Sequence, residues 1–539
     1  MSRPIALFGF LVTVIAVLGG VALMKGGFYI AKHEGDTLHL LQILFRMVDG
    51  EVPHLDFMTP LGALAFWPIV LLLKAGISIG KAILMSQIMV ALVMLPAIFW
   101  AAYSRFNNAL SYFFGLVVLV LILALVHGEA QPSLSISMHY NRWAWAISYV
   151  AIVVAVLPGA SAKNESLDGV IIGLAMVALV MIKVTYVVSF APPVVVALLL
   201  RGATRSLVVA LVTGAAVGLG LTLALGVEYW TAYVGDILTV SGSQTRPQPG
   251  APLKAVIGEP QYLGGSLVLF VAVVLLRQAG EQVLGLVTLL LVPGFFYVTY
   301  QNFGNDPQWL MLLAILLLVP RPDADMVNGF GWNLRRALGI AAMATVAFGV
   351  PSFLNLAYSP FRHATVKTSL YSPLLPRTPA QADLQARTVR SLRVDGKVGL
   401  DVPGSGLEGL QEEALRPETR VEFQGEVMVA CELEMGISGW FDSIATDLEA
   451  SGFGARKIFA ADNFNSLWMF GTTQRLKKGA PWYYGGLPGI DDADLLLVPQ
   501  CAASQSLRKQ VLDLIVQKGI EVREVHRTPL IILYEIVRG

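Results

Sequence analysis

The residues best suited to chemistry lie in one stretch near the N-terminus, residues 33–60 (HEGDTLHLLQILFRMVDGEVPHLDFMTP). The stretch follows a long apolar run, yet it is rich in acidic side chains. Its carboxylate and imidazole groups are Glu34, Asp36, Asp49, Glu51, Asp56, His33 and His54. Such groups can take a proton from one reactant and give it to another. We therefore take this stretch as the first candidate for a catalytic site.

The same stretch also has a purely structural interpretation. Polar residues recur between Thr37 and Asp49 on one face, while apolar residues such as Leu41 and Phe45 occupy another. This pattern predicts an amphipathic helix lying at a membrane surface. Asp36 stands where the N-cap of that helix would be, so a simple capping role is the alternative. A cap would explain one acid and leave Glu34 without a role.

Two later segments carry further polar clusters between apolar runs. Residues 127–145 (HGEAQPSLSISMHYNRWAW) contain Glu129, His139, Tyr140, Asn141 and Arg142. Residues 299–309 (TYQNFGNDPQW) contain Gln301, Asn302, Asn305 and Asp306. The structural alternative for the first cluster is an aromatic belt with an arginine anchor at the membrane interface. For the second cluster it is a polar turn that caps the next helix.

Two basic residues complete the set of candidates. Lys183 lies between two short apolar runs, and Arg246 lies in the long segment 227–261. A lysine at membrane depth costs about 2.5–3.5 kcal/mol to insert, so it usually faces a cavity or a partner. Carboxylates and cations at a membrane edge suit a reaction between a polar acceptor and a lipid-borne anion. A carboxylate would deprotonate the attacking hydroxyl, and the cations would stabilise a phosphate leaving group.

The composition indicates that lipid solvates much of this chain of 539 residues. It is 55% hydrophobic and 14% charged, whereas soluble proteins carry roughly 25% charged residues. We find no basic stripe interleaved with aromatic residues, so we do not expect nucleic acid to be a partner. The N-terminal apolar run is too long for a signal peptide and lacks a small-residue cleavage site. We expect it to be a retained first transmembrane helix.

A membrane-spanning helix needs about 20 mostly apolar residues. We predict about eleven spans, at residues 4–24, 82–103, 109–127, 143–159, 168–183, 185–200, 205–226, 262–277, 281–298, 308–320 and 334–353. The segment 60–78 is also apolar, but Pro68 and Lys74 favour a helix along the surface. If 60–78 lies along the surface, the short loops that carry arginine and lysine all lie on the same side of the membrane. By the positive-inside rule that side is the cytoplasm. The candidate polar segments and all residues after 355 then lie on the external face.

The composition changes after Pro360 to that of a soluble domain. Strand-like segments alternate with two helical patterns, at 440–451 and 504–519, which predicts a small α/β domain. The predicted strands are 426–433, 456–461, 493–499, 520–525 and 529–537. We therefore divide the chain into a transmembrane domain, 1–355, with a first external loop, 25–81, and an external domain, 356–539. Cys431 and Cys501 either form one disulfide or remain two buried thiols.

The stretch 33–62 resembles the first external loop of the GT-C superfamily of glycosyltransferases, which use polyprenyl-phosphate sugars. Bacterial members are similar in carrying a DEG-like start, an amphipathic helix and a G-x-P-Y-x-D-F-like end, matched here by HEG and GEVPHLDF. The family includes protein mannosyltransferases and lipid A aminoarabinose transferases. Here His33 stands at the usual aspartate position, so Glu34 aligns with the family's glutamate and Asp36 is a nearby replacement.

The resemblance implies an inverting transferase of the cell envelope, in which Asp36 or Glu34 is the base. Substrate contacts would come from His33, His54, Asp56, His139, Tyr140, Asn141, Arg142, Lys183, Arg246, Asn305 and Asp306. Some members bind a divalent metal such as Mg²⁺ or Mn²⁺, for which Glu34, Asp36, Glu129 and His139 are the candidate ligands. The partners would be a polyprenyl-phosphate-sugar donor and a glycan, lipid or protein acceptor.

The resemblance also implies a multi-pass protein of the bacterial inner (plasma) membrane, with the C-terminal domain in the periplasm or outside the cell. Two other functions fit the same polar clusters. A transporter or flippase for a lipid-linked glycan would also need a polar cavity with cations, but it would favour inverted repeats and charges at the membrane midplane. A membrane scaffold without catalytic activity is the other alternative, because His33 departs from the family's aspartate.

Overall fold

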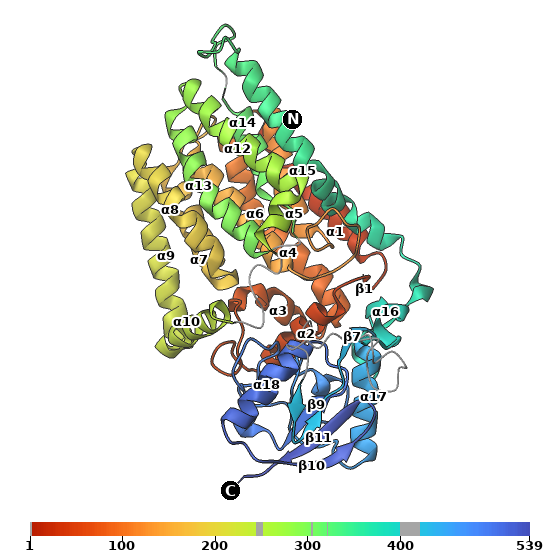
Figure 1. The fold of residues 1–539 in the computed structure, drawn as a ribbon. Helices are drawn as coiled ribbons and strands as arrows, with labels where there is room; N and C mark the ends of the chain where they lie inside the picture. Colours follow the sequence, from red (N-terminus) through yellow and green to blue (C-terminus); the bar gives the residue numbers. More distant parts are fainter. Residues whose placement is uncertain (1–2, 244–251, 303–304, 321, 399–420, 539) are drawn as a thin grey trace.

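The computed structural model describes residues 3–243, 252–302, 305–320, 322–398 and 421–538. A tall bundle of helices forms one part, and a smaller domain of strands and helices packs against its lower end (Figure 1). The N-terminus lies toward the far end of the bundle in this view, and the C-terminus lies in the smaller domain. The predicted combination of a helical membrane region with a C-terminal α/β region is therefore confirmed at this level.

Each of the eleven predicted spans coincides with a helix. These helices are α1 (Arg3–Leu23), α4 (Ile79–Arg105), α5 (Asn108–Leu123), α6 (His139–Val156), α7 (Glu165–Ile182), α8 (Val184–Leu200), α9 (Thr204–Leu225), α12 (Pro260–Gln278), α13 (Gln282–Gln301), α14 (Trp309–Leu318) and α15 (Leu334–Ala364). Within the described residues, seven are long and apolar enough to cross a membrane, namely α1, α4, α7, α9, α12, α13 and α15. Helices α5, α8 and α14 are apolar but shorter.

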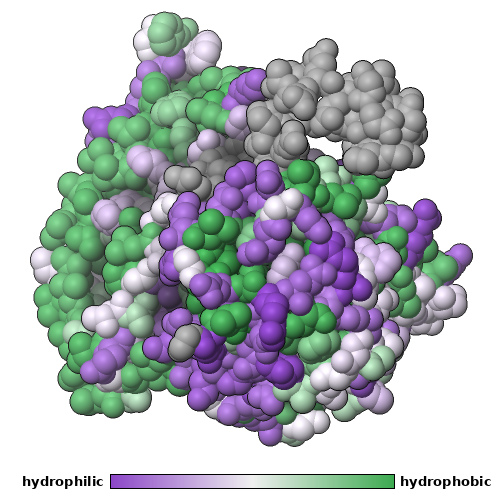
Figure 2. Space-filling view, turned by 60° about the horizontal axis from the view of Figure 1, so that its bottom comes forward, coloured by the Kyte–Doolittle hydropathy of each residue, from purple (hydrophilic) through white to green (hydrophobic). Residues whose placement is uncertain are grey.

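The outward surface of the bundle is apolar, as a lipid-facing surface must be. On α9, for example, Leu211, Leu219 and Leu223 are exposed. In Figure 2 the flanks of the bundle are mostly hydrophobic, whereas the forward face of the C-terminal domain is mostly hydrophilic. Apolar patches of this extent are not stable in water, so the bundle is suited to a membrane.

Short helices and loops lie where the bundle meets the C-terminal domain. They include α2 (Glu34–Val48), α3 (Trp67–Lys74), α10 (Val227–Ser241) and α11 (Leu253–Gly258). The segment 60–78 thus contains a short helix, in agreement with the prediction that it does not form a full span. At the opposite end, the Arg3 guanidinium donates to Ser161 Oγ at 2.7 Å, and the Arg105 guanidinium pairs with the Asp168 carboxylate. The basic short loops therefore gather away from the C-terminal domain.

The C-terminal domain contains a four-stranded sheet in the order β10-β11-β9-β8. Its strands are β8 (Ile458–Ala460), β9 (Leu495–Pro499), β10 (Val522–Arg527) and β11 (Ile531–Ile536). Strand β9 pairs parallel with β8 and antiparallel with β11. Alternate residues of a strand face opposite sides of a sheet. Accordingly, Leu496 and Val498 pack in one core with α18 (Gln505–Gln517), and Leu495 and Leu497 pack in the core that includes residues of α17 (Ile437–Ala450).

The smaller elements complete this domain. They are β2 (Tyr371–Pro373), β3 (Leu384–Arg387), α16 (Thr388–Leu392), β4 (Asp395–Val398), β5 (Glu422–Phe423), β6 (Glu426–Val427) and β7 (Cys431–Met435). The predicted strand 426–433 is therefore divided between β6 and β7. Helix α15 continues past the predicted domain boundary at residue 355 and ends at Ala364.

The segment 25–81, which was predicted to be the first external loop, packs against the C-terminal domain. Strand β1 (Phe28–Ile30) pairs in parallel with β3, which places both in one three-stranded sheet. The amide of Gln42 on α2 donates to Ser466 Oγ at 2.8 Å and to the Pro481 carbonyl at 3.0 Å. A Cβ on Gly35 would lie 2.7 Å from the Phe464 ring. The polar face of α2 therefore contacts protein rather than lipid headgroups, which corrects the prediction of an interfacial helix.

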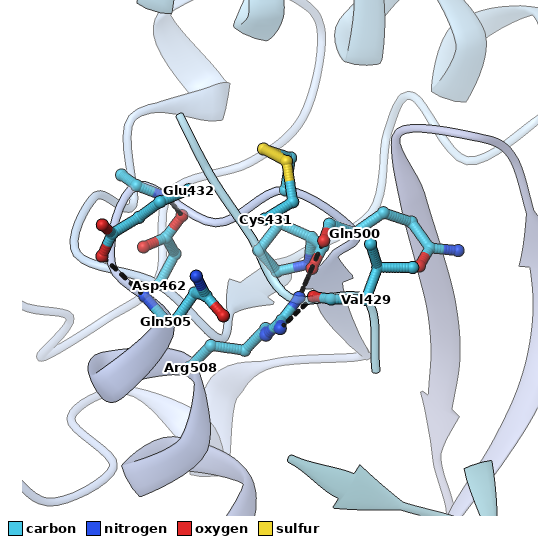
Figure 3. The surroundings of a disulfide bond; sticks show 10 residues. Val429, Cys431, Glu432, Asp462, Gln500, Gln505 and Arg508 are labelled. Carbon is cyan, nitrogen blue, oxygen red and sulfur yellow. Dashed lines mark hydrogen bonds between the residues drawn. A yellow bond between two sulfur atoms is a disulfide. The ribbon is translucent and has the colours of Figure 1, made fainter. Parts of the chain in front are cut away.

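The two cysteines form a disulfide, which decides between the two alternatives left open by the sequence. Cys431 on β7 is bonded to Cys501, which follows β9. Beside it, the buried Arg508 guanidinium donates to the carbonyl oxygens of Val429 and Gln500, each at 2.8 Å (Figure 3). The disulfide and this arginine both hold the segment before β7 against the end of β9.

Replacing Cys501 with serine is expected to destabilise the C-terminal domain by about 2–4 kcal/mol, because a crosslink over a long loop restricts the unfolded chain. The two cysteines are separated by 70 residues. Thermal unfolding of the purified protein, followed by tryptophan fluorescence, would measure the change. Reductant should lower the wild-type midpoint and leave the Cys501→Ser midpoint unchanged. A wild-type midpoint that does not respond to reductant would contradict the expectation.

Candidate functional site

A cavity of about 280 Å³ lies where the helical bundle meets the C-terminal domain. Helix α2, the segment before α6, the start of α8, helix α10 and the end of α13 all contribute to its wall. Its polar lining residues are Asp36, His39, Ser137, His139, Tyr140, Lys183, Thr185, Ser241, Tyr297, Gln301, Asn302 and Tyr484. Segments from distant parts of the chain thus place a carboxylate and an ammonium group around one space.

Asp36 lies in the first turn of α2, which begins at Glu34. The N-cap of this helix is His33, whose backbone is left-handed with φ of 67°, so Asp36 is not the cap that one interpretation of the sequence predicted. The half-buried Asp36 carboxylate instead accepts a hydrogen bond from Ser137 Oγ at 2.7 Å. Ser137 thus fixes the orientation of the carboxylate at the cavity wall.

Lys183 lies at the break between α7 and α8, where its own backbone is extended. Its ammonium group donates to the amide oxygens of Asn141, at 3.2 Å, and Asn302, and lies 5.7 Å from the centre of the Tyr140 ring. Two amide oxygens and an aromatic face hold the ammonium group at the cavity wall. Such a cation is suited to bind an anionic group that enters the cavity.

The residues of the predicted group 139–142 lie in two different environments. His139 and Tyr140 line the cavity, and His139 Nε2 lies 2.9 Å from the Ala65 carbonyl oxygen. Arg142 is fully buried away from the cavity lining, and its guanidinium donates to the backbone carbonyls of Val126 and Ala124. Arg142 therefore holds the preceding loop in place, which is a structural role.

Glu34 and His33 also have protein partners outside the cavity. Both oxygens of the buried Glu34 carboxylate accept hydrogen bonds from the Arg390 guanidinium of α16, at 2.8 and 2.9 Å. His33 Nδ1 lies 3.0 Å from Ser135 Oγ, and burial lowers the pKa of this histidine. The structure therefore gives Glu34 the geometry of a docking contact between α2 and the C-terminal domain, and it leaves Asp36 as the acid at the cavity.

His54 and Asp56 lie in the turn after α2 and take part in other contacts. His54 Nδ1 is 2.8 Å from Asp236 Oδ2 of α10, and the imidazole packs against the rings of Tyr229 and Tyr233. Asp56 accepts a hydrogen bond from the backbone N–H of Val52 at 2.7 Å. His54 thus tethers α10, which forms one wall of the cavity, to the first external loop.

The third predicted loop contributes Gln301 and Asn302 to the cavity lining, whereas its Asn305 and Asp306 lie outside that lining. The Asn305 amide contacts Met138 Sδ at 2.8 Å, and Met138 lines the cavity. Asp306 accepts a hydrogen bond from the Gln261 amide at 3.0 Å, and burial raises the pKa of its carboxyl group to about 6. Both residues support the wall rather than line it. Arg246 lies outside the described residues.

The candidate metal ligands do not converge on one point. Asp36 and His139 line the cavity, whereas Glu34 pairs with Arg390 and Glu129 pairs with Lys32 at 3.3 Å. Within the described ranges, no group of three or more His, Cys, Asp or Glu side chains is arranged to hold a metal ion. A requirement for Mg²⁺ or Mn²⁺ stays a prediction.

Comparisons with protein-family models, with curated proteins and with solved structures found no match for this chain. The functional argument therefore rests on the residues around the cavity and on their chemistry.

Several residues that line the cavity were not predicted from the sequence. Ser137 lies within residues 127–145, but a lone serine in a sequence does not indicate a site. Tyr484 comes from the C-terminal domain, and it is followed by Gly485 and Gly486, whose φ angles are positive. The sequence contained no signal that this glycine-bounded turn would reach a cavity formed mainly by the bundle.

Two apolar grooves lie on the sides of the bundle near this cavity. One, of about 420 Å³, is formed by α11, α12 and α13 and shares Tyr297 with the cavity. The other, of about 400 Å³, is formed by α3, α4, α6 and α7. A groove with almost wholly apolar walls that adjoins a polar cavity at Tyr297 suits a molecule with a hydrocarbon tail and a polar head.

Replacing Glu34 with glutamine is expected to weaken the docking of the C-terminal domain by about 1–2 kcal/mol, because a charged bidentate contact to Arg390 becomes a neutral one. Limited proteolysis and thermal unfolding of the purified protein would measure the loss. Glu535→Gln, which alters an exposed pair with Arg523, is the matched control and should change stability little. Equal stability of Glu34→Gln and wild type would contradict this role.

Proposed function

We propose that this protein is a membrane glycosyltransferase that moves a sugar from a polyprenyl-phosphate donor to an acceptor hydroxyl. The observation that carries the proposal is that the Asp36 carboxylate and the Lys183 ammonium line one cavity at the end of a membrane-suited bundle. The sequence resemblance to GT-C transferases supports the same conclusion. The acceptor is a glycan, lipid or protein with a free hydroxyl group.

The reaction is a single displacement at the anomeric carbon of the sugar. Asp36 takes the proton of the acceptor hydroxyl as its oxygen forms a bond to that carbon. The bond from the carbon to the phosphate oxygen breaks, and polyprenyl phosphate leaves with the bonding electrons. Lys183 stabilises the charge that develops on this phosphate. The configuration at the anomeric carbon is inverted, because the acceptor attacks opposite the leaving group.

The apolar groove that shares Tyr297 with the cavity is the place for the donor's hydrocarbon tail. Its polar lining is very small, so it would exclude the phosphate head and direct it toward Lys183. The position of the Lys183 ammonium in the cavity lining supports this orientation, because a cation there can pair with the phosphate.

The proposal includes the arrangement of the chain in its membrane. We propose that all eleven helices that match the predicted spans cross the bacterial inner membrane, with α6 and the short α14 almost wholly buried among the others. The basic short loops would then face the cytoplasm by the positive-inside rule. The cavity and the C-terminal domain would lie on the periplasmic side.

Purified protein in lipid nanodiscs, supplied with a labelled polyprenyl-phosphate sugar and a mixture of envelope glycans and lipids, tests the proposal. Release of polyprenyl phosphate together with label on an acceptor is the expected result, and a nucleotide sugar should not replace the donor. Movement of an intact donor across a proteoliposome membrane without cleavage would instead identify a flippase. If the protein neither cleaves the donor nor moves it across the membrane, the result favours a scaffold.

A further inference from the structure

A second polar cleft lies on the C-terminal domain side of α2. It has a volume of about 790 Å³ and is formed by the loop after α2 together with the segments around 457 and 468–478. Its charged and aromatic lining residues are Asp49, Glu51, Asp56, Lys457, Trp468, Arg475, Lys477 and Lys478. Nothing in the proposed transfer step uses this cleft.

The charges in the cleft are not balanced. The Arg475 guanidinium pairs with Asp49 at 2.7 Å and with Glu51 at 3.4 Å, and the Lys457 ammonium pairs with Asp492 at 2.7 Å. Lys477 and Lys478 are both exposed. In the part of the chain that the structure describes, neither of their ammonium groups forms an ion pair. Two adjacent cations thus remain for a ligand.

The backbone holds these two lysines at the wall of the cleft. The Lys478 N–H donates to the Asp56 carbonyl at 3.0 Å, and the Lys477 N–H donates to Asp492 Oδ2 at 2.8 Å. Lys478 is left-handed, with φ of 55°. A residue other than glycine rarely adopts this conformation, so the surrounding contacts must fix it. The lysines are therefore attached to a well-defined part of the surface.

The other lining groups match the chemistry of a sugar chain. The half-buried Trp468 offers an apolar ring edge, and its ring centre is 5.0 Å from the Arg475 guanidinium. Asp56, Thr473 and Gln474 can exchange hydrogen bonds with hydroxyl groups. A glycan with hydroxyls and spaced negative charges can pair with both the carboxylates and the lysines of the cleft.

The cleft is connected by the chain to the catalytic cavity. The segment 478–484 runs from Lys478 in the cleft to Tyr484 in the cavity lining. A segment of this length spans at most about 20 Å even when fully extended. A flexible polymer could therefore lie in the cleft while its end reaches the cavity.

We propose that this cleft binds an anionic glycan chain, carboxylated or phosphorylated, and that this chain is the acceptor. The assignment as acceptor rests on the proposed function, whereas the binding of an anionic glycan does not. Lys477 and Lys478 bind the negative groups, and the cleft holds the chain so that its end can approach Asp36.

Binding of two fluorescent probes to the full-length protein in neutral-lipid nanodiscs tests the proposal. One probe is an oligogalacturonate, which carries carboxylates, and the other is a poly(glycerol phosphate) oligomer. We expect at least one to bind, with an affinity reduced about tenfold or more in the double variant Lys477→Glu/Lys478→Glu and with a clear dependence on salt. The probe that binds identifies the anionic group. A neutral maltooligosaccharide should bind more weakly.

The double variant Lys367→Glu/Lys518→Glu is the matched control, because both lysines are exposed in the C-terminal part of the chain and lie outside the cleft lining. Its affinity should equal that of the wild type. Equal affinities for the two double variants, or no binding of either anionic probe, would overturn the proposal. The proposal would also be overturned if neither probe binds while anionic vesicles bind in a way that depends on Lys477 and Lys478.

The Asp36→Asn variant separates this proposal from the proposed function. It should bind the anionic probe as the wild type does, because Asp36 lies outside the cleft lining. If the wild type binds the probe but never cleaves a polyprenyl-phosphate sugar, the proposed function fails and the cleft remains a glycan site. If cleavage is normal and binding does not depend on the lysines, the cleft proposal fails and the proposed function stands.

Discussion

Replacing Asp36 with asparagine is expected to lower the rate of sugar transfer by about 10²–10⁴-fold, which is the usual contribution of a positioned general base. Asparagine has nearly the same shape and can still accept the hydrogen bond from Ser137 Oγ. It cannot take a proton from the acceptor hydroxyl. The measurement is the initial rate of polyprenyl phosphate release, with thermal unfolding to confirm that the variant is folded.

Asp395→Asn is the matched control, since this carboxylate pairs with Arg393 and lines neither the cavity nor the cleft. It should retain most of the activity. Ser137→Ala should give a smaller loss than Asp36→Asn, because Ser137 only positions the base. Full activity of Asp36→Asn, or an equal loss in Asp395→Asn, would show that Asp36 is not the base.

Replacing Lys183 with methionine is the second substitution with a large expected effect. We expect transfer to fall by about 10²–10³-fold, the range found when a group that stabilises transition-state charge is removed. Methionine keeps much of the length of the side chain but carries no charge, so the leaving phosphate loses its cation. Lys183→Arg should recover part of the activity, because arginine also binds phosphate. Steady-state rates at several donor concentrations separate the loss of donor binding from the loss of turnover.

Lys74→Met provides the matched control for this substitution. Lys74 ends α3 and lies 5.6 Å from the centre of the Trp67 ring, outside the cavity lining. Its replacement should leave transfer near the wild-type rate. A Lys183→Met variant as active as Lys74→Met would contradict the assigned role of Lys183.

The sequence predicted the elements well where local pattern decides them. Long apolar runs can form only helices in lipid, because backbone groups must be satisfied within the segment, and each predicted span coincides with a helix. Short apolar runs such as that of β9 likewise predicted the strands of the C-terminal domain. The extent of α15 was not predicted, because polar residues near its end resemble the start of a soluble domain.

The candidate site was predicted in part. Asp36, His139, Tyr140 and Lys183 do line one cavity. The partners of Glu34 and Arg142 could not be predicted, because they depend on tertiary contacts. Arg390 is far from Glu34 in the sequence, and the carbonyl groups that Arg142 binds give no sequence signal at all.

The groups that cover the polar face of α2 could not be predicted from the sequence either. Its polar face predicted contact with water or lipid headgroups, since periodicity distinguishes polar from apolar faces but does not identify what covers them. In the structure Gln42 and Arg46 donate to groups of the C-terminal domain. A polar face can therefore form a domain interface when the partner supplies carbonyl and hydroxyl acceptors.

The most direct test of the account is an experimental structure of the protein in nanodiscs with a polyprenyl-phosphonate sugar that cannot be cleaved. The account predicts that the phosphonate lies against the Lys183 ammonium, that the anomeric carbon faces Asp36, and that the tail lies in the groove that shares Tyr297 with the cavity. A ligand bound with its phosphonate away from Lys183, or with its sugar away from Asp36, would contradict it.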